Sequence, residues 1–405
     1  MKKLLSVVAV MAVAMLGVVT TPDEGSAVPA FARQTGQACF ACHYQHIPKL
    51  NAFGRAFKIG GFTDAAVDLI EDDNLSIPAN LPVAFILKYR FQKTTPKETV
   101  AGQDDAGTDN GEWQIPDETA IFVAGRAGEH TGYAVEWGGP YLSGKVIFPF
   151  SLGDTTVGLS VYSTEGAGPA YGIEPFNTGV NPMDRMFEHG PETSAAIRSG
   201  ITTAAEGLTL YAGGDMFFAA VGLWGPAPDK ADTGFDLSTY YRLAFTPTVA
   251  DMNLMIGVYG VAGETKCVDC LDSTDGKKNT IKTEAFGVDA QLQGEVAGMP
   301  LEVQAVYATA GGDAPSDART SNLYTKADGF SAAAELSLNP IIGVALGYGN
   351  YTNKSGAKDV STNAVTVGLP INLAQNVTLR PEYTTYGDDG RPKDNKFTLM
   401  LFAGF

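Results

Sequence analysis

Hydrophobic and polar residues alternate along much of the chain, as in strands whose two faces meet different surroundings. Three stretches show the alternation: Val365, Val367, Leu369, Ile371 and Leu373 against Thr366, Gly368 and Asn372; Val377, Leu379 and Tyr383 against Thr378, Arg380 and Glu382; and Phe286, Val288, Ala290 and Leu292 against Glu284, Asp289 and Gln291. Successive strand side chains point to opposite faces, so a lipid-facing row and a lumen-facing row would give this pattern. A soluble β-sandwich also alternates.

The connections between these stretches alternate in length. Short turns are expected near 129–132, 152–155, 204–207, 247–251, 295–299, 339–340 and 374–376. Longer polar connections are expected near 94–117, 164–192, 225–235, 263–281, 311–327, 353–361 and 387–394, with a shorter one near 138–142. This spacing predicts an all-β fold: a 16-stranded antiparallel outer-membrane β-barrel over residues 80–405, with both termini on the periplasmic, short-turn side. Residues 207–224 are ambiguous, because Gly213-Gly214 could mark a bulge or split one strand into two.

Both ends of the sequence favour a membrane barrel over a soluble sandwich. The last strand alternates and ends in aromatic Phe405, which looks like the signal read by the outer-membrane assembly machinery. At the other end, Met1-Lys2-Lys3, an apolar run over 4–19 and small residues near 25–30 predict a signal peptide over 1–27. No later stretch reaches the ~20 apolar residues of a membrane helix. We therefore expect export through the inner membrane.

The composition of the chain limits what it can bind and which fold classes it can adopt. Glycine accounts for 47 of 405 residues, and charged residues make up 18%, below the ~25% usual in soluble domains. The net charge of −17 argues against binding of nucleic acid. With four cysteines in the whole chain, a disulfide scaffold is excluded. Outer-membrane lipid is the expected surrounding.

The candidate chemistry lies in Cys39-Phe40-Ala41-Cys42-His43. C-x-x-C-H is the attachment signature of haem c: the two thiols form thioethers, and the histidine is the proximal iron ligand. A zinc site would need a fourth ligand beyond His46, and a thioredoxin-like site would need a βαβ context. We therefore expect one covalent haem c on Cys39, Cys42 and His43.

The haem-bearing segment is predicted to cover residues 28–79. About 50 residues form a marginal core and can hardly wrap a macrocycle. No Gly/Ser linker separates this segment from the first strand. We therefore expect a small helical cytochrome plug inside the barrel or at its periplasmic mouth.

Several further residues have two interpretations. The distal iron ligand is sought in the long loop 164–192, at Met183, Met186 or His189, although each also fits an ordinary loop residue. On a helix, His46 would share one side with His43 and flank the site. Cys267 and Cys270 lack a following histidine and predict a short disulfide or, failing that, a surface metal site. His130 is expected to be solvated in a short turn.

Charged positions on the predicted lumen face are either paired with one another or available to a ligand. The inward arginines could receive haem propionates as bidentate partners. The long loops are acidic, for example at Asp104, Asp229 and Asp313, which would attract divalent cations or bridge surface lipid. The predicted inward residues are Lys88, Arg90, Arg126, Arg242, Arg380, Glu136, Asp289, Glu302, Glu335 and Glu382.

The N-terminal segment resembles a known family. Residues 29–36 (PAFARQTG), the C-x-x-C-H and the run Pro48-x-Leu50-Asn51-x-Phe53-Gly54-Arg55-x-Phe57-Lys58 are similar to the N-terminus of the fused monohaem cytochrome–porins, the outer-membrane iron oxidases of iron-oxidising bacteria. The resemblance covers about 30 residues. It implies haem c on Cys39, Cys42 and His43, a sixteen-stranded barrel and oxidation of Fe(II) outside the cell.

The expected function follows from that resemblance. The chain would be an Fe(II)-oxidising oxidoreductase that passes single electrons through one haem to a periplasmic c-type cytochrome. Oxidation outside the cell keeps insoluble ferric product away from the interior. Two alternatives stay open: a haem-plugged porin for small solutes, and a general extracellular electron conduit that is not specific for iron.

Overall fold

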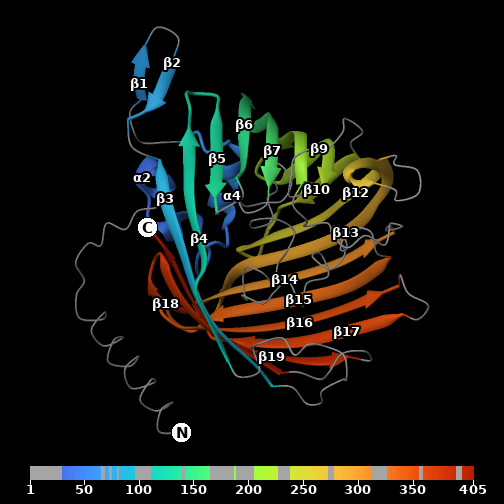
Figure 1. Cartoon of the computed structure of the whole chain (residues 1–405). Helices are drawn as coiled ribbons and strands as arrows, with labels where there is room; N and C mark the ends of the chain where they lie inside the picture. Colours follow the sequence, from blue (N-terminus) through green and yellow to red (C-terminus); the bar gives the residue numbers. More distant parts are fainter. Residues whose placement is uncertain are drawn as a thin grey trace.

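The described residues include the strands that close the barrel wall. The computed structural model describes residues 30–64, 69–72, 75–79, 82–95, 111–138, 142–164, 187, 205–226, 238–271, 278–311, 326–354, 359–388 and 395–405. In these residues the strands close into one barrel, in which β20 pairs with β3 and every pairing is antiparallel (Figure 1). No helix among them is long and apolar enough to cross a membrane.

Sixteen strands form the wall, as expected. Two further short pieces, β11 (Thr248–Val249) and β18 (Ile371–Ala374), extend the short turns and pair with β12 and β19. The wall strands are β3 (Val83–Thr95), β4 (Glu112–Arg126), β5 (Gly132–Trp137), β6 (Leu142–Leu152), β7 (Thr155–Thr164), β8 (Ala205–Gly213), β9 (Phe217–Pro226), β10 (Ser238–Phe245), β12 (Met252–Leu271), β13 (Lys278–Val296), β14 (Met299–Ala310), β15 (Ala327–Ser337), β16 (Gly343–Asn353), β17 (Val360–Gly368), β19 (Val377–Asp388) and β20 (Asn395–Gly404).

The two faces of the wall follow the alternation in the sequence. Val365 and Val367 are exposed on the outside, while Thr366 between them is buried. Similarly, Asp289 and Gln291 are buried and Val288 is exposed. Glu284 is an exception, because it is exposed on the same face as Phe286 and Val288 rather than with Asp289. The outer face is therefore apolar over most of its height, and the polar side chains point into the lumen.

Three predicted connections and one predicted strand are wrong in position. The loop expected at 94–117 ends earlier, because β4 begins at Glu112. Residues 205–207 of the turn expected at 204–207 lie inside β8, and 207–224 forms the hairpin β8–β9, whose short connection spans residues 214–216. The strand expected from 361 to 374 ends at Gly368 and resumes as β18. The loop expected at 263–281 is shorter, because β12 reaches Leu271 and β13 begins at Lys278. A strand expected over 192–204 lies outside the described residues.

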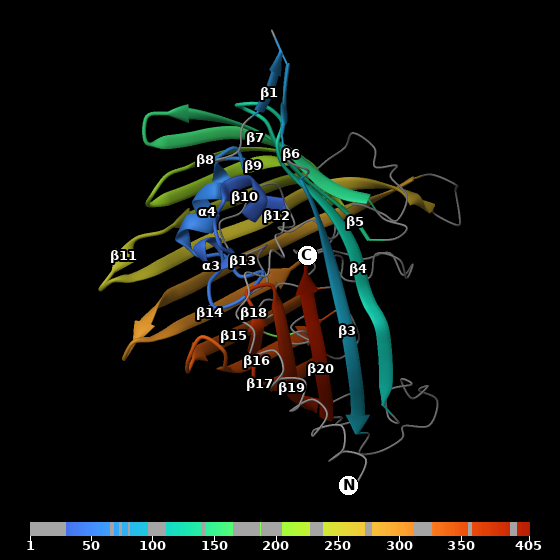
Figure 2. The ribbon, with the colours of Figure 1, turned by 90° about the vertical axis from the view of Figure 1, so that its left-hand side faces the viewer.

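The N-terminal segment contains three short helices, α2 (Ala30–Thr35), α3 (Cys39–Cys42) and α4 (Ala52–Ile59). Asn51 caps α4 by accepting a hydrogen bond from the Gly54 amide, and Gly60 ends the helix. A hairpin of β1 (Leu69–Asp72) and β2 (Leu75–Pro78) follows, which the sequence did not predict, and it stands apart from the barrel wall in Figures 1 and 2. The barrel itself begins at Val83 rather than at residue 80.

The helices lie within the ring of strands, at the end where the short turns are (Figure 2). This segment is hydrogen-bonded to several separate parts of the wall. Gln34 accepts from the backbone amide of Arg126, and the Tyr211 hydroxyl donates to the Ile59 carbonyl. The backbone amide of Cys39 donates to the Gln375 side chain. Phe31, Phe57 and Phe62 form an aromatic cluster within the segment. Residues 30–64 are called the plug below.

Gly132 of β5 permits the closest approach between plug and wall. A Cβ at Gly132 would overlap the carbonyl group of Gly61, and one at Gly61 would press on Pro149 and Ile147 of β6. Gly61 also has a positive φ of 67°, which favours glycine there. The plug thus packs directly against the wall backbone at this point.

Candidate functional site

The two cysteines of the C-x-x-C-H motif lie at opposite ends of the four-residue helix α3. Both thiols are half-buried and are not bonded to each other. Burial raises the pKa of both thiols, so the folded segment holds them in the protonated form. Both line one cavity, so one planar group placed in it could reach both sulfurs.

His43 leaves α3 and continues in extended conformation (φ −102°, ψ 139°). Its Nδ1 lies 3.2 Å from the carbonyl oxygen of Lys49. A carbonyl can only accept, so the proton is on Nδ1 and the lone pair is on Nε2. Burial lowers the pKa of the His43 imidazole to about 4. His43 is thus a neutral imidazole with its tautomer fixed, which is the form in which histidine binds a metal.

Asn51 and Gly54 join the motif to α4. The Asn51 side chain donates to the carbonyl of Ala41 at 2.8 Å, and the Asn51 amide donates to the carbonyl of Cys42 at 2.9 Å. Gly54 packs against the same carbonyl, where a Cβ would overlap the oxygen. These contacts hold the C-x-x-C turn on the first turn of α4.

The cavity beside the motif is formed jointly by the plug and the wall. Its lining includes Cys39, Cys42, His43 and Ile47 from the plug. The remaining lining residues are mostly apolar: Phe31 and Ala32 from α2, Ala84, Phe85 and Ile86 from β3, Phe122 from β4 and Phe402 from β20. An apolar cavity with two thiols and a neutral imidazole on one side fits a haem c. The donor set and the lining therefore agree with the expected cofactor.

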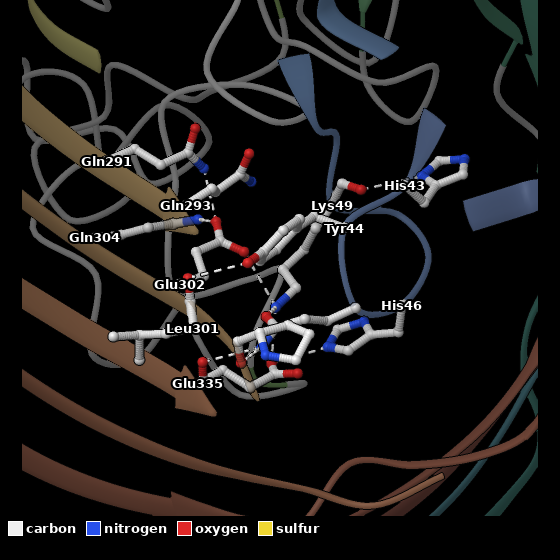
Figure 3. A network of polar contacts seen from close by, with 12 residues as sticks. His43, Tyr44, His46, Lys49, Gln291, Gln293, Leu301, Glu302, Gln304 and Glu335 are labelled. Atoms are coloured by element: carbon white, nitrogen blue, oxygen red, sulfur yellow. Dashed lines mark hydrogen bonds and ion pairs between the residues drawn. The ribbon is translucent and has the colours of Figure 1, made fainter. Parts of the chain in front are cut away.

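A buried network of charges lies on the other side of the His43 backbone (Figure 3). Lys49 is fully buried, and its Nζ is 3.1 Å from Glu302 of β14 and 2.9 Å from Glu335 of β15. Glu335 also accepts from His46 Nε2 at 2.9 Å. A buried cation between two carboxylates offsets much of the cost of removing all three from water.

His46 occupies this network, which contradicts its predicted place beside the haem site. It is 1% exposed, and its Nδ1 lies 2.9 Å from Arg380 Nη2. Arginine only donates, which calls for a lone pair on Nδ1, but the Ile47 carbonyl 3.0 Å from the same Nδ1 only accepts, so these contacts do not fix the protonation of Nδ1. Nε2–H donates to Glu335 in either case. Burial lowers the pKa of His46, opposed by the neighbouring Glu335.

Arg55 and Tyr44 add further polar bonds between plug and wall. Arg55 donates to Gln291 at 3.0 Å and to Gln293 at 3.2 Å, and the Tyr44 hydroxyl donates to the carbonyl of Gly294. Sequence reasoning missed Lys49, Arg55 and Tyr44 as contact residues. The sequence held one signal for them. Lys49 and Arg55 are basic residues in the short segment after the motif, and predicted inward carboxylates could have been expected to pair with them.

The other predicted inward residues are buried or half-buried, as expected. Among the inward arginines, Arg242 forms a bidentate pair with Asp289, Arg90 pairs with Asp117 and Arg380 holds His46. The Arg242–Asp289 and Arg90–Asp117 pairs match the interpretation of mutual pairing within the wall, whereas Arg380 bonds to His46 and to the Ile47 carbonyl of the plug. Lys88 pairs with Glu118.

Other predicted site residues are only partly described. Met183, Met186 and His189 lie outside the described residues, so the distal ligand stays a prediction. Their neighbour Phe187 is buried in the lumen with Ala333 and Ala345. The side chains of Cys267 and Cys270, and most of the acidic loop residues, lie outside the described part as well. His130 is exposed in its turn, as expected. In the described ranges, no group of three or more His, Cys, Asp or Glu forms a further metal site.

No family model and no curated protein matches the chain. Among solved structures, it is similar to the channel DcaP of Acinetobacter baumannii (12% identity, 80% of this chain and 96% of that one, TM-score 0.48) and to an anion-selective porin from Comamonas acidovorans (13%, 80% and 98%, 0.47). It is also similar to the outer-membrane protein OmpT of Vibrio cholerae (11%, 84% and 100%, 0.45). With TM-scores below 0.5, we base no conclusion about this chain on these likenesses.

Proposed function

We propose that the chain is an outer-membrane electron-transfer protein that carries one haem c in its plug. One observation supports this above the others: Cys39, Cys42 and His43 line a single apolar cavity, and the bond between His43 Nδ1 and the Lys49 carbonyl leaves the imidazole lone pair on Nε2. An outer-membrane location is supported by the apolar outer face of a closed barrel. The short turns and the plug would then face the periplasm.

Each part of the site has a task in this proposal. Cys39 and Cys42 would hold the haem through thioethers, and His43 would bind its iron. When bound, the haem would accept one electron at a time and pass it on. Phe122 and Phe402 would shield the cavity from water and lower its dielectric constant, which is one of the ways in which a protein sets a reduction potential. No general acid or base is needed for this chemistry.

Fe(II) outside the cell is the proposed electron donor, and a periplasmic c-type cytochrome is the proposed acceptor. The resemblance of residues 29–58 to the fused cytochrome–porins supports this assignment. The barrel gives a physical reason, because a lipid layer with an apolar band about 25 Å tall insulates the two compartments. A cofactor inside the barrel shortens the distance that an electron must cross.

A haem-plugged porin for small solutes is the second candidate. Barrels of 16 strands can leave an aqueous channel, and the wall of this one carries buried polar residues on its lumen face, such as Thr209, Gln304 and Thr398. In this alternative the plug would regulate the passage of solutes, and the haem would stabilise the plug. A conduit that is not specific for iron would share the haem site and differ only in its donor.

Stopped-flow reduction of the haem by Fe²⁺ tests the proposal. The full chain is matured with covalent haem, and His43→Ala is compared with His130→Ala, which changes an exposed histidine in a turn. We expect rapid reduction in the wild type and in His130→Ala, and a slow or absent response in His43→Ala. Haem that dithionite reduces and Fe²⁺ does not would refute the iron role. Solute flux into liposomes without any redox response would favour the porin.

A further inference from the structure

Lys49 connects the proposed iron ligand to the barrel wall. Its backbone carbonyl lies 3.2 Å from Nδ1 of His43, and the same carbonyl accepts from the Tyr44 amide at 2.8 Å. Its side chain extends to the wall and ends between Glu302 and Glu335. One residue thus contacts the histidine with its main chain and two strands of the barrel with its ammonium group (Figure 3).

The turn that carries this carbonyl is fixed at several points. The carbonyl of Ile47 accepts from Arg380 of β19 at 2.7 Å, and the side-chain Nε2 of Gln45 donates to the backbone carbonyls of Pro300 and Glu335. In addition, the side-chain Nδ2 of Asn372 donates to the backbone carbonyl of Gln45 at 2.9 Å. These hydrogen bonds to the wall therefore fix the position of the Lys49 carbonyl relative to the His43 ring.

We propose that Lys49 is a positioning residue through which the barrel wall sets the reduction potential of the haem. The proposal rests on the proposed haem attachment to Cys39, Cys42 and His43. A hydrogen bond from Nδ1–H to a carbonyl makes imidazole a stronger donor to iron, which favours Fe(III) and lowers the potential. A carbonyl released from the wall would form a weaker bond and give a higher potential.

A single substitution would mix two effects, because removal of the ammonium also changes the charge near the iron. The double variant Lys49→Met/Glu335→Gln removes one positive and one negative charge and keeps an acceptor for His46. The matched control, Arg242→Met/Asp289→Asn, removes a buried ion pair that is equally neutral overall and joins β10 to β13. The control breaks a wall pair without touching the Lys49 turn.

The experiment is a spectroelectrochemical titration of the full chain with covalent haem, together with the electron paramagnetic resonance of the ferric form. In Lys49→Met/Glu335→Gln, we expect the Fe(II)/Fe(III) ratio at a fixed ambient potential to rise about tenfold, by analogy with the roughly 10- to 100-fold loss of metal affinity or activity that follows the removal of an outer-shell partner. For one electron this corresponds to about 59 mV. The ferric g-values should also move. The control should stay within about twofold of the wild type.

Two results would overturn the inference: an unchanged ratio in the double variant with its haem intact, or an equal change in the control. If this double variant yields no haem protein, the second charge-neutral pair, Lys49→Met/Glu302→Gln, is compared with the same double control. A rise of several-fold in Lys49→Met/Glu302→Gln but not in the control supports the role of Lys49, and equal ratios refute it. A wild-type chain that attaches no haem would instead refute the proposed function itself.

Discussion

Replacement of Glu335 by alanine should release the plug from the wall. In the native protein, Glu335 is 1% exposed and accepts hydrogen bonds from both Lys49 and His46 at 2.9 Å. Alanine leaves the His46 Nε2–H without its acceptor and leaves Lys49 with Glu302 alone. Removal of one partner from a buried ion pair costs about 3–5 kcal/mol. We expect the lower value, about 3 kcal/mol, because Glu302 remains. At 1.4 kcal/mol per factor of ten, the undocked population rises roughly a hundredfold.

Limited proteolysis measures that population. Trypsin cleaves after lysine and arginine, and Lys49, Arg55 and Lys58 are all buried in the docked plug. When opening is fast relative to cleavage, the cleavage rate follows the equilibrium population of the open form. Cleavage at Arg55 and Lys58, quantified by mass spectrometry, should be roughly a hundred times faster in Glu335→Ala. Asp289→Asn breaks a buried pair away from the plug and should leave the rate unchanged. A rate in Glu335→Ala within about threefold of the wild type would refute the role of Glu335 in holding the plug against the wall.

Three other predictions concern the packing of the plug and the buried charges that bind it to the wall. Gly132→Ala should displace the plug, because its Cβ would overlap the Gly61 carbonyl, whereas Gly138→Ala meets nothing within 4 Å and should be silent in the proteolysis assay. Gly54→Ala should lower the yield of covalent haem severalfold, as measured by haem staining per barrel, because its Cβ would push the Cys42 carbonyl out of place. Docking should weaken as the pH falls from about 6.5 towards the lowered pKa of His46, since the undocked histidine binds protons more readily. Hydrogen exchange in α4 should show this loss, His46→Gln should flatten the dependence, and equal slopes in both proteins would contradict the assignment.

Period-two alternation was sufficient to predict the barrel and the direction of most wall residues. The predicted count of 16 strands came from the spacing of the connections and is correct, but it treated 207–224 as one strand where the structure has β8 and β9, and it included a strand over 192–204 that lies outside the described residues. The error at 204–207 has a specific cause. Gly207 looks like a turn residue, yet it lies within β8, where a Cβ would overlap the Leu223 carbonyl and meet the hydroxyl of Tyr162. From the sequence alone, a glycine that permits close packing inside a strand cannot be distinguished from a glycine that forms a turn. The true connection follows at Gly214, and the ambiguity noted at Gly213-Gly214 was its signal.

The error at His46 comes from helix geometry that does not continue. Spacing by three places His43 and His46 on one side only if the helix runs through both residues. The helix ends at Cys42, and His43 is already extended. The partners of His46 are Glu335 and Arg380, which are about 290 and 330 positions away along the chain. Sequence reasoning identified both partners as inward-facing, but nothing local in the sequence pairs a plug residue with a particular strand.

The contacts of the plug explain why the lumen of this barrel is polar. In an open porin, inward polar residues solvate a water-filled channel. Here Gln291, Gln293, Glu302, Glu335 and Arg380 are bonded to plug residues, at the end of the barrel where the short turns lie. Their polarity is therefore used to hold a protein segment in place, and it does not by itself indicate a path for solutes. A transport role requires that these bonds open during function, whereas electron transfer requires that they stay closed. The release of the plug in Glu335→Ala should consequently raise ion conductance across a planar bilayer in both cases, but it should slow haem reduction only if the docked plug is the working state.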